Sequence, residues 1–254
     1  MSGILSGKTA VIAGIANRWS LAYAIAESFS REGASLVLTY VNDKQKETIE
    51  SITGGMAVLK MLPLDVTKDE DIQGLADGLK ALERPIEVLV HSLAFANRED
   101  LSNPFIETSR EGFLLAQNVS AYSLVAMTRA VAPLMPSGGS VITLSYLGAT
   151  RVMPHYNVMG TAKAALESSV RYLAADLGPR NIRVNAISAG AVKTASARAV
   201  KDLTSLMEFA KQWSPMKRLT DPAEVGDAAA FLASDLGRGL TGNIMFVDAG
   251  MHMV

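Results

Sequence analysis

The sequence predicts an α/β fold, a doubly wound parallel sheet flanked by helices. Strand-length apolar runs alternate with longer helical patterns from one end of the chain to the other, as in a parallel sheet with helical crossovers. Most of these runs are continuously apolar, which is typical of strands covered on both faces. The chain has 254 residues, 49% hydrophobic and 19% charged, and no linker or internal repeat. We therefore expect one domain over residues 1–254 with a sizeable core.

Each element is expected from a local pattern. Short apolar runs predict strands at 9–13, 35–40, 57–64, 86–91, 140–145, 183–188 and 244–247. The segments between them predict helices at 21–31, 43–51, 68–82, 110–134, 155–177 and 222–234. The stretch 189–215 breaks this rhythm because it is longer than an ordinary strand-to-helix connection. We expect a lid or binding loop there, at about 191–215.

Composition excludes several classes of function. The formal net charge is -1 and no basic stripe is present, so nucleic acid is not an expected partner. The absence of cysteine excludes disulfides, thiol catalysis and thiolate metal sites. His91, His155 and His252 lack the spacing of metal ligands, so we interpret them as structural. The N-terminus has no signal-peptide pattern and no apolar run is long enough to span a membrane, so we expect a cytoplasmic protein with no membrane partner.

Tyr156 and Lys163 are the strongest candidates for catalysis. They lie seven residues apart in the predicted helix 155–177, which Pro154 is expected to start. Each helical residue turns by roughly 100°, so both side chains project from one face, roughly 10 Å apart along the axis. A phenol and an ammonium placed in this way can serve a reacting oxygen and a bound cofactor.

The first two strands predict a nucleotide site. Gly14 ends the first strand before a helix, where α/β sheets bind a pyrophosphate. The usual three-glycine spacing is missing, so an ordinary turn with Ser20 as the helix N-cap stays open. At the second strand's end, Val41 has no neighbouring arginine or lysine for a 2′-phosphate, which favours NADH over NADPH. Lys44 and Lys46 are assigned to a solvated helix face.

Later strand ends carry further candidates, each with a plainer alternative. Asp65 can accept the adenine amino group, or Asp65 or Thr67 can cap the next helix. The small residues of segment 92–96 let a flat ligand approach, or they only pack. Tyr146 is a second phenol in the cleft, or a rim residue. Met159, one turn after Tyr156, is a pocket candidate.

Three segments carry a family resemblance. Residues 144–148, 156–163 and 183–190 closely resemble the bacterial NADH-dependent enoyl-acyl-carrier-protein reductases, in the divergent branch of the short-chain dehydrogenase/reductase superfamily. The most specific element is the six-residue gap between Tyr156 and Lys163, where ordinary superfamily members have three. The turn from Gly14 to Ser20 also matches the divergent branch.

The resemblance implies a role for each matching residue. Tyr156 would donate a hydrogen bond to the thioester carbonyl of a 2-trans-enoyl group, and Lys163 would bind the nicotinamide ribose. Tyr146 matches a second active-site tyrosine, while Ala96 and Met159 would line the substrate pocket with the two tyrosines. The expected cofactor-binding residues, from the strand ends and the resemblance, are Gly14, Ser20, Leu21, Val41, Asp65, Val66, Ser92, Leu93, Lys163, Val192, Lys193, Thr194, Ala195 and Ser196.

The resemblance also implies an acyl-carrier-protein partner, a homotetramer and a Rossmann-type sheet. It further implies that the lid at about 191–215 is helical and binds the substrate. The charge on Lys163 is expected to favour an enolate and to lower the pKa of Tyr156. Two positions depart from the family: Ala191 replaces a usual proline, and Ala94 replaces a glycine of some members. Two other functions stay open, a 3-ketoacyl or other carbonyl reductase, against which the tyrosine–lysine spacing argues, and a non-catalytic NAD-binding protein.

Overall fold

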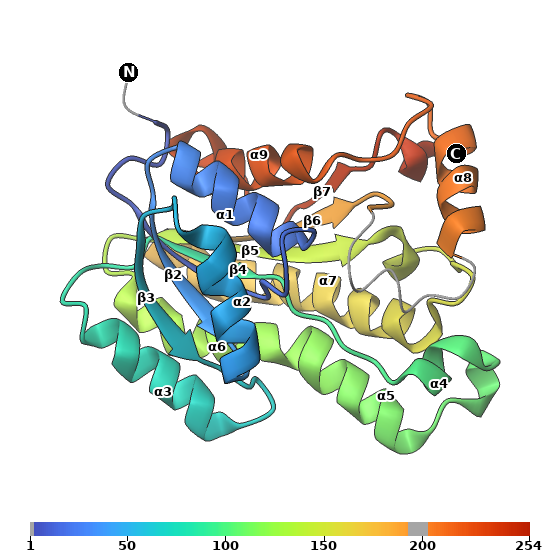
Figure 1. The fold of residues 1–254 in the computed structure, drawn as a ribbon, viewed down its shortest axis with the longest axis horizontal. Helices are drawn as coiled ribbons and strands as arrows, with labels where there is room; N and C mark the ends of the chain where they lie inside the picture. Colours follow the sequence, from blue (N-terminus) through green and yellow to red (C-terminus); the bar gives the residue numbers. More distant parts are fainter. Residues whose placement is uncertain (1–2, 193–202) are drawn as a thin grey trace.

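One parallel sheet organises the molecule (Figure 1). The computed structural model describes residues 3–192 and 203–254. Within them the strands form one sheet in the order β3-β2-β1-β4-β5-β6-β7, and every neighbouring pair is parallel. The predicted fold class is therefore confirmed. The strands are β1 Thr9–Ala13, β2 Ser35–Tyr40, β3 Val58–Pro63, β4 Val88–His91, β5 Gly139–Tyr146, β6 Ile182–Ala189 and β7 Ile244–Val247.

Helices cover both faces of the sheet. Apolar residues of α1, α2 and α9 pack on one face, and those of α3, α6 and α7 pack on the other. In Figure 1, α8 stands at the end of the molecule farthest from the N-terminus. The α-helices are α1 Leu21–Arg31, α2 Asp43–Thr53, α3 Asp69–Lys80, α4 Arg98–Ser102, α5 Arg110–Gln117, α6 Ser123–Val131, α7 Asn157–Leu177, α8 Leu203–Trp213 and α9 Pro222–Ala233.

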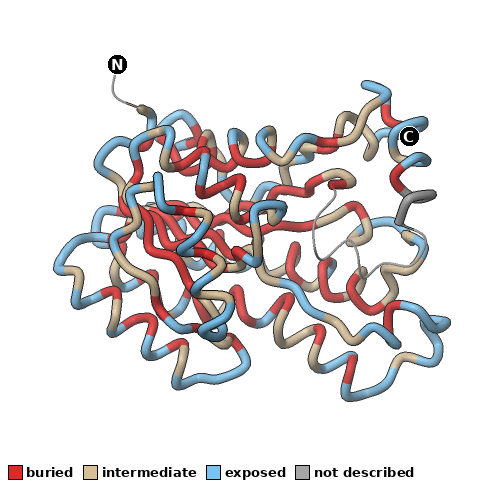
Figure 2. The backbone as a smooth tube through the Cα atoms, viewed as in Figure 1, coloured by how far each residue is buried: buried red, intermediate tan, exposed pale blue. Residues whose placement is uncertain are grey.

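The continuously apolar strands are explained by this two-sided cover. All of β1 is buried, and its successive side chains join opposite core layers. Val11 packs with the α3, α6 and α7 side, while Ile12 packs with the α1, α2 and α9 side. Figure 2 accordingly shows the central strands as the buried part of the molecule. Alternation between polar and apolar residues disappears because both faces exclude water.

The chain order reverses beside β1, and this sets the position of the site. β1 pairs with β2 on one side and with β4 on the other, with Ala13 opposite His91 at their carboxyl ends. The connections leaving β1 and β4 turn to opposite faces of the sheet, so a crevice is expected between them. The seven strands of the described residues are all parallel, so every carboxyl end faces the same edge as this crevice.

Two predicted helices differ from the observed ones. The predicted helix 110–134 is α5, a π-helical turn at Asn118–Tyr122, α6 and a 3₁₀ turn at Ala132–Leu134. The second difference is that α7 begins at Asn157, so Tyr156 is its N-cap residue and Pro154 precedes it in a turn. Hydrophobic periodicity did not predict either change. A continuous α-helix and an α-helix interrupted by one π-helical turn show the same pattern of apolar residues.

Residues 3–192 and 203–254 contain neither a membrane-spanning helix nor a cluster of potential metal ligands. No helix in residues 3–192 or 203–254 combines the length and the apolar character needed to cross a membrane. In the same part of the chain, no three histidine or acidic side chains gather closely enough to hold a metal ion.

Candidate active site

Tyr156 is held in place by its glycine neighbour and by a second tyrosine. A Cβ atom on Gly148, in the 3₁₀ turn that follows β5, would lie 2.4 Å from Cδ1 of the Tyr156 ring. Only glycine therefore allows this turn to approach the ring so closely. The Tyr146 ring meets the Tyr156 ring edge-on, with centroids 4.9 Å apart at 63°. The two phenols predicted for one cleft are thus in contact.

The Tyr156 hydroxyl is kept protonated by its surroundings. It makes no hydrogen bond to any described residue, and the one buried side-chain polar atom lacking a partner in that part of the chain is Thr128 Oγ1. Burial raises the pKa of Tyr156, and the charges of Tyr146 and Glu167 raise it further. The expected lowering of the Tyr156 pKa by Lys163 is therefore wrong: the shift is upward, and desolvation of the phenolate is its largest cause.

Lys163 is a buried cation on the same helix. Its side chain is only 5% exposed, and Nζ donates a hydrogen bond to the Leu144 carbonyl oxygen at 2.7 Å. Burial lowers the pKa of Lys163 to about 8, although the Glu167 carboxylate acts in the opposite direction. An ammonium has three donors. Two therefore remain for a ligand's hydroxyl groups.

An apolar cluster adjoins the Tyr156 ring. Its buried members are Leu101, Ala116, Val158, Met159 and Ala162. Ala96 and Tyr156 pack against this cluster and are themselves partly buried. The two pocket candidates from the sequence, Ala96 and Met159, therefore lie in the same cluster as the catalytic candidate. An acyl chain whose carbonyl reached Tyr156 would meet apolar side chains here.

The β1–β4 crevice has the backbone shape of a nucleotide site. Gly14 has φ +107, and a Cβ there would lie 2.0 Å from the Ser92 carbonyl oxygen. The two strand ends therefore touch backbone to backbone, with Ser92 N–H donating to Ala13 O at 3.1 Å. A flat dinucleotide crossing between these ends needs this lack of side chains. The residues present thus fit the expected cofactor.

We expect Gly14→Ala to weaken both the fold and dinucleotide binding. The strained backbone alone costs about 1–3 kcal/mol, and the methyl group would have to displace the Ser92 carbonyl. Urea unfolding and NADH fluorescence titration measure the two effects. Gly54→Ala is the matched control, since Gly54 has φ -59 and open space around it. Equal stability of the two variants would contradict this account of Gly14.

Ser20 and Leu21 begin α1 beside this crevice. Ser20 occupies the N-cap position, but its hydroxyl donates to the Asn17 carbonyl oxygen at 2.5 Å and caps no helical N–H. Ser20 is therefore the N-cap residue that the alternative named, but its side chain does not cap the helix. Trp19 N–H donates to Asn17 Oδ1, which tightens the same turn. The first helical N–H groups are left without a side-chain cap, as at an anion-binding helix start.

Gln45 was missed from the sequence and ties two parts of the crevice together. Its Oε1 accepts from Val41 N–H at 2.7 Å, while its Nε2 donates to the Ile15 carbonyl oxygen at 2.9 Å. The end of β2 is thereby fixed to the turn after β1. No local pattern marks a glutamine for this bridge. Of the nearby lysines, Lys46 lies 5.8 Å from the centre of the Tyr40 ring and Lys44 is exposed.

Asp65 stabilises its own turn at the end of β3. Thr67 donates to Asp65 Oδ1 from both its N–H, at 3.0 Å, and its hydroxyl, at 2.7 Å. These hydrogen bonds lower the pKa of Asp65. The N-cap residue of α3 is Lys68, so neither Asp65 nor Thr67 caps that helix. Val66, the next residue, is buried.

Two serines, in the π-helical turn and at the start of α6, make hydrogen bonds to the end of β4 and to the segment that follows it. Buried His91, at the end of β4, contacts Thr143 Oγ1 at 2.9 Å and Ser123 Oγ at 2.7 Å. Burial, with a contribution from Lys163, lowers the pKa of His91 to about 3. In the π-helical turn, Ser120 Oγ accepts from Phe95 N–H at 3.0 Å. That turn therefore positions segment 92–96, which contains Ser92, Leu93, Ala94 and Ala96.

The remaining candidates follow β6. Val192 is buried and Ala191 is half-buried. Lys193, Thr194, Ala195 and Ser196 lie outside the described residues, as does part of the expected lid. α8 lies within the predicted range 191–215.

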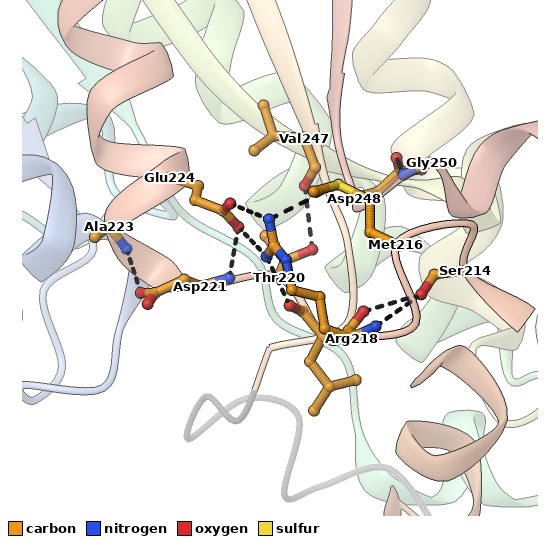
Figure 3. Close-up of polar contacts among 11 residues, drawn as sticks. Ser214, Met216, Arg218, Thr220, Asp221, Ala223, Glu224, Val247, Asp248 and Gly250 are labelled. Atoms are coloured by element: carbon orange, nitrogen blue, oxygen red, sulfur yellow. Dashed lines mark hydrogen bonds and ion pairs between the residues drawn. The ribbon is translucent and has the colours of Figure 1, made fainter. Parts of the chain in front are cut away.

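Polar contacts fix the chain where it leaves α8 (Figure 3). Arg218 forms a two-pronged ion pair with Glu224, at 2.8 and 2.5 Å. Glu224 also accepts from Asp221 N–H, completing the capping box of α9. Ser214, one residue beyond α8, exchanges hydrogen bonds with the Arg218 backbone. The carboxyl end of α8 is therefore anchored to α9.

Comparison with known proteins agrees with this geometry. Residues 14–252 match the family model described as Enoyl-(Acyl carrier protein) reductase. A Bacillus subtilis enoyl-acyl-carrier-protein reductase specified for NADH is 45% identical over 255 residues, 100% of this chain and 99% of that protein. A Staphylococcus aureus counterpart specified for NADPH is 44% identical over 252 residues, 98% of each chain.

Solved structures show the same fold. The Bacillus cereus enoyl-acyl-carrier-protein reductase, crystallised with NADP+ and indole naphthyridinone, has a TM-score of 0.97 at 46% identity and covers 99% of each chain. The Anaplasma phagocytophilum reductase in complex with NAD has a TM-score of 0.95 at 40% identity, covering 100% of this chain and 95% of that one.

Proposed function

The chain belongs to the family of enoyl-(acyl carrier protein) reductases, and we propose that Tyr156, Lys163 and Tyr146 form its active centre. The family resemblance, the reductase activity and the nicotinamide cofactor expected from the sequence are confirmed by the relatives. We further propose that the enoyl group arrives as a thioester of acyl-carrier protein. One catalytic domain over residues 1–254 and a cytoplasmic location remain predictions.

The Tyr156 phenol, edge-on to Tyr146 and beside the apolar cluster, is the observation that supports this centre. When bound, NADH supplies the hydride that adds to the β-carbon of the 2-trans-enoyl thioester. Negative charge then develops on the thioester carbonyl oxygen. Tyr156 stays protonated because its pKa is raised, so it can donate a hydrogen bond to that oxygen. A donor fixed in advance favours the transition state over the ground state.

The other residues bind and orient. Lys163 has two free N–H donors for ribose hydroxyls, and its position on α7 is fixed by the Leu144 carbonyl. Tyr146 holds the Tyr156 ring by edge-to-face contact. Ala96 and Met159 offer an apolar wall to the acyl chain. Gly14, Ser92 and Leu93 leave the crevice open to the dinucleotide, and α8 forms part of the substrate lid.

An absorbance assay tests the proposed reaction. Crotonyl thioester should oxidise NADH, while acetoacetyl thioester should leave it unchanged. The reverse result would indicate a carbonyl reductase, and NADH binding without turnover of either thioester would indicate a non-catalytic protein. Repeating the assay with NADPH measures the cofactor preference. This measurement is needed because one relative is specified for NADH and another for NADPH.

We also propose a homotetramer. Large apolar side chains are exposed along α5 and α7, including Leu114 at 60% and Tyr172 at 74%. At the C-terminus, Met253 and Val254 are exposed, and Arg151 binds the backbone of the same tail. Light scattering should therefore give about four times 27.0 kDa. Leu114→Lys combined with Tyr172→Lys should reduce this mass, and a monomeric unsubstituted protein would refute the assembly.

A further inference from the structure

Two consecutive residues at the end of β5 are fastened to two residues one turn apart on α7. The Leu144 carbonyl oxygen accepts from Lys163 Nζ at 2.7 Å. The next residue, Ser145, donates from its hydroxyl to Glu167 Oε1 at 2.5 Å. Tyr146 follows immediately and ends the strand. Two hydrogen bonds therefore join the end of β5, which carries Tyr146, to α7, which carries Lys163.

Glu167 is a buried acidic residue that the reaction described above does not use. It is 7% exposed, and Ser145 is its hydrogen-bonding partner. Residues four apart on a helix are neighbours, roughly 5–6 Å apart at Cβ, so Glu167 and Lys163 are neighbours on the same face of α7. Buried acids are rarely retained without a partner. A purely structural link between β5 and α7 would need only a neutral side chain here.

The carboxylate acts on the ionisable groups around it. It raises the pKa of Lys163 against the lowering by burial, and it also raises the pKa of Tyr156. Lys163 in turn lowers the pKa of His91 on β4. His91 and Tyr156 are thus the ionisable groups whose pKa values respond to Lys163 or Glu167. Other charged side chains on elements packed against α7 are Arg98, Glu99, Asp100, Arg110, Glu111, Arg129, Arg180 and Arg183.

These other charged groups do not compete for Lys163. Six of the eight are exposed, so water screens them. Buried Asp100 accepts from Ser109 N–H at 3.0 Å. Half-buried Arg183 donates to the backbone carbonyls of Gly237 and Ser234. Glu167 is therefore the carboxylate that opposes the lowering of the Lys163 pKa by burial.

We propose that Glu167 is a positioning residue for the reductase: held by Ser145, its carboxylate keeps Lys163 in the ammonium form that binds the ribose. The inference rests on the proposed role of Lys163. It extends the active centre from the Tyr156–Lys163 pair to a buried group a further turn along α7. Ser145 contributes by fixing the direction of the carboxylate.

The test is the pH dependence of NADH binding, measured by fluorescence titration between pH 6 and 10 without substrate. In the unsubstituted protein, affinity should be constant at low pH and fall above the Lys163 pKa of about 8. Glu167→Gln retains the size and the acceptor for Ser145 but removes the charge. The midpoint of the fall should then move down by about 1 pH unit, with affinity at pH 6 changed by less than about twofold.

Three further variants make the result decisive. Asp176→Asn removes an exposed carboxylate from the same helix and should leave the midpoint in place. Lys163→Met should abolish the fall in NADH affinity at high pH. That result would assign the fall to the deprotonation of Lys163. If Glu167→Gln fails to fold, Glu167→Met provides the same removal of charge. An unmoved midpoint in a folded, uncharged variant would overturn the proposal, whereas loss of thioester reduction alone would bear only on the proposed function.

Discussion

Tyr156→Phe should lower kcat for crotonyl thioester by about 100- to 1,000-fold, the usual effect of removing one donor to a developing oxyanion. NADH affinity should stay within about twofold of that of the unsubstituted protein, because the proposed hydrogen bond of the hydroxyl is to the substrate and not to NADH. Stability should also be retained, since that hydroxyl makes no hydrogen bond to a described residue. Single-turnover oxidation of NADH separates the chemical step from product release.

Tyr146→Phe is the matched control for this variant. The two rings are 4.9 Å apart, so both substitutions remove one hydroxyl from the same cleft. If Tyr146 acts by holding the Tyr156 ring, Tyr146→Phe keeps that contact and should lose less than about tenfold in kcat. A larger loss at Tyr146 than at Tyr156 would exchange the roles of the two tyrosines. Undiminished turnover by Tyr156→Phe would remove it from the mechanism.

Lys163→Met should weaken NADH binding by about 10- to 150-fold, because hydrogen bonds to a charged group contribute about 1.5–3 kcal/mol. Methionine fills a similar volume, so the apolar surroundings of the side chain stay packed. The two donors not used by the Leu144 carbonyl are lost with the ammonium. Fluorescence titration at pH 6.5, where Lys163 is charged in the unsubstituted protein, measures the difference.

The comparison for Lys163 is Arg171→Met, which removes a positive charge from the exposed part of the same helix. It should leave NADH affinity within about twofold at ordinary ionic strength, because exposed charges are screened. Equal weakening in both variants would mean that Lys163 acts only through the overall field. Thermal unfolding without NADH confirms that each variant is folded.

Much of the fold was predictable because its signals are local. The apolar runs of β1, β2 and β6 and the amphipathic helices around them needed no knowledge of neighbours. The missed details are those that packing decides. The π-helical turn at Asn118–Tyr122 brings Ser120 to Phe95, a residue 25 positions earlier. α4, with five residues, was too short to show a periodic pattern.

Some residues of the candidate site were predictable from local sequence signals, and others were found only in the structure. Tyr156 and Lys163 were marked by their spacing, and Gly14 by its place after a strand. Gln45 and Glu167 carried no such mark, since each acts through one contact with a distant segment. The expected low pKa of Tyr156 was wrong for the same reason. Sequence separation indicates which charges are near, but burial decides whether a charge is tolerated.

The sequence by itself determined the fold class, the strand positions and the tyrosine–lysine pair, because hydrophobic period and residue spacing are properties of neighbours along the chain. Only the tertiary structure decided which backbones touch and which ionisable groups are buried. Gly14 against Ser92, Gly148 against Tyr156 and Glu167 against Ser145 are contacts between separate elements. These contacts form only when the elements pack together in the folded protein. The same packing excludes water from the ionisable groups that it buries.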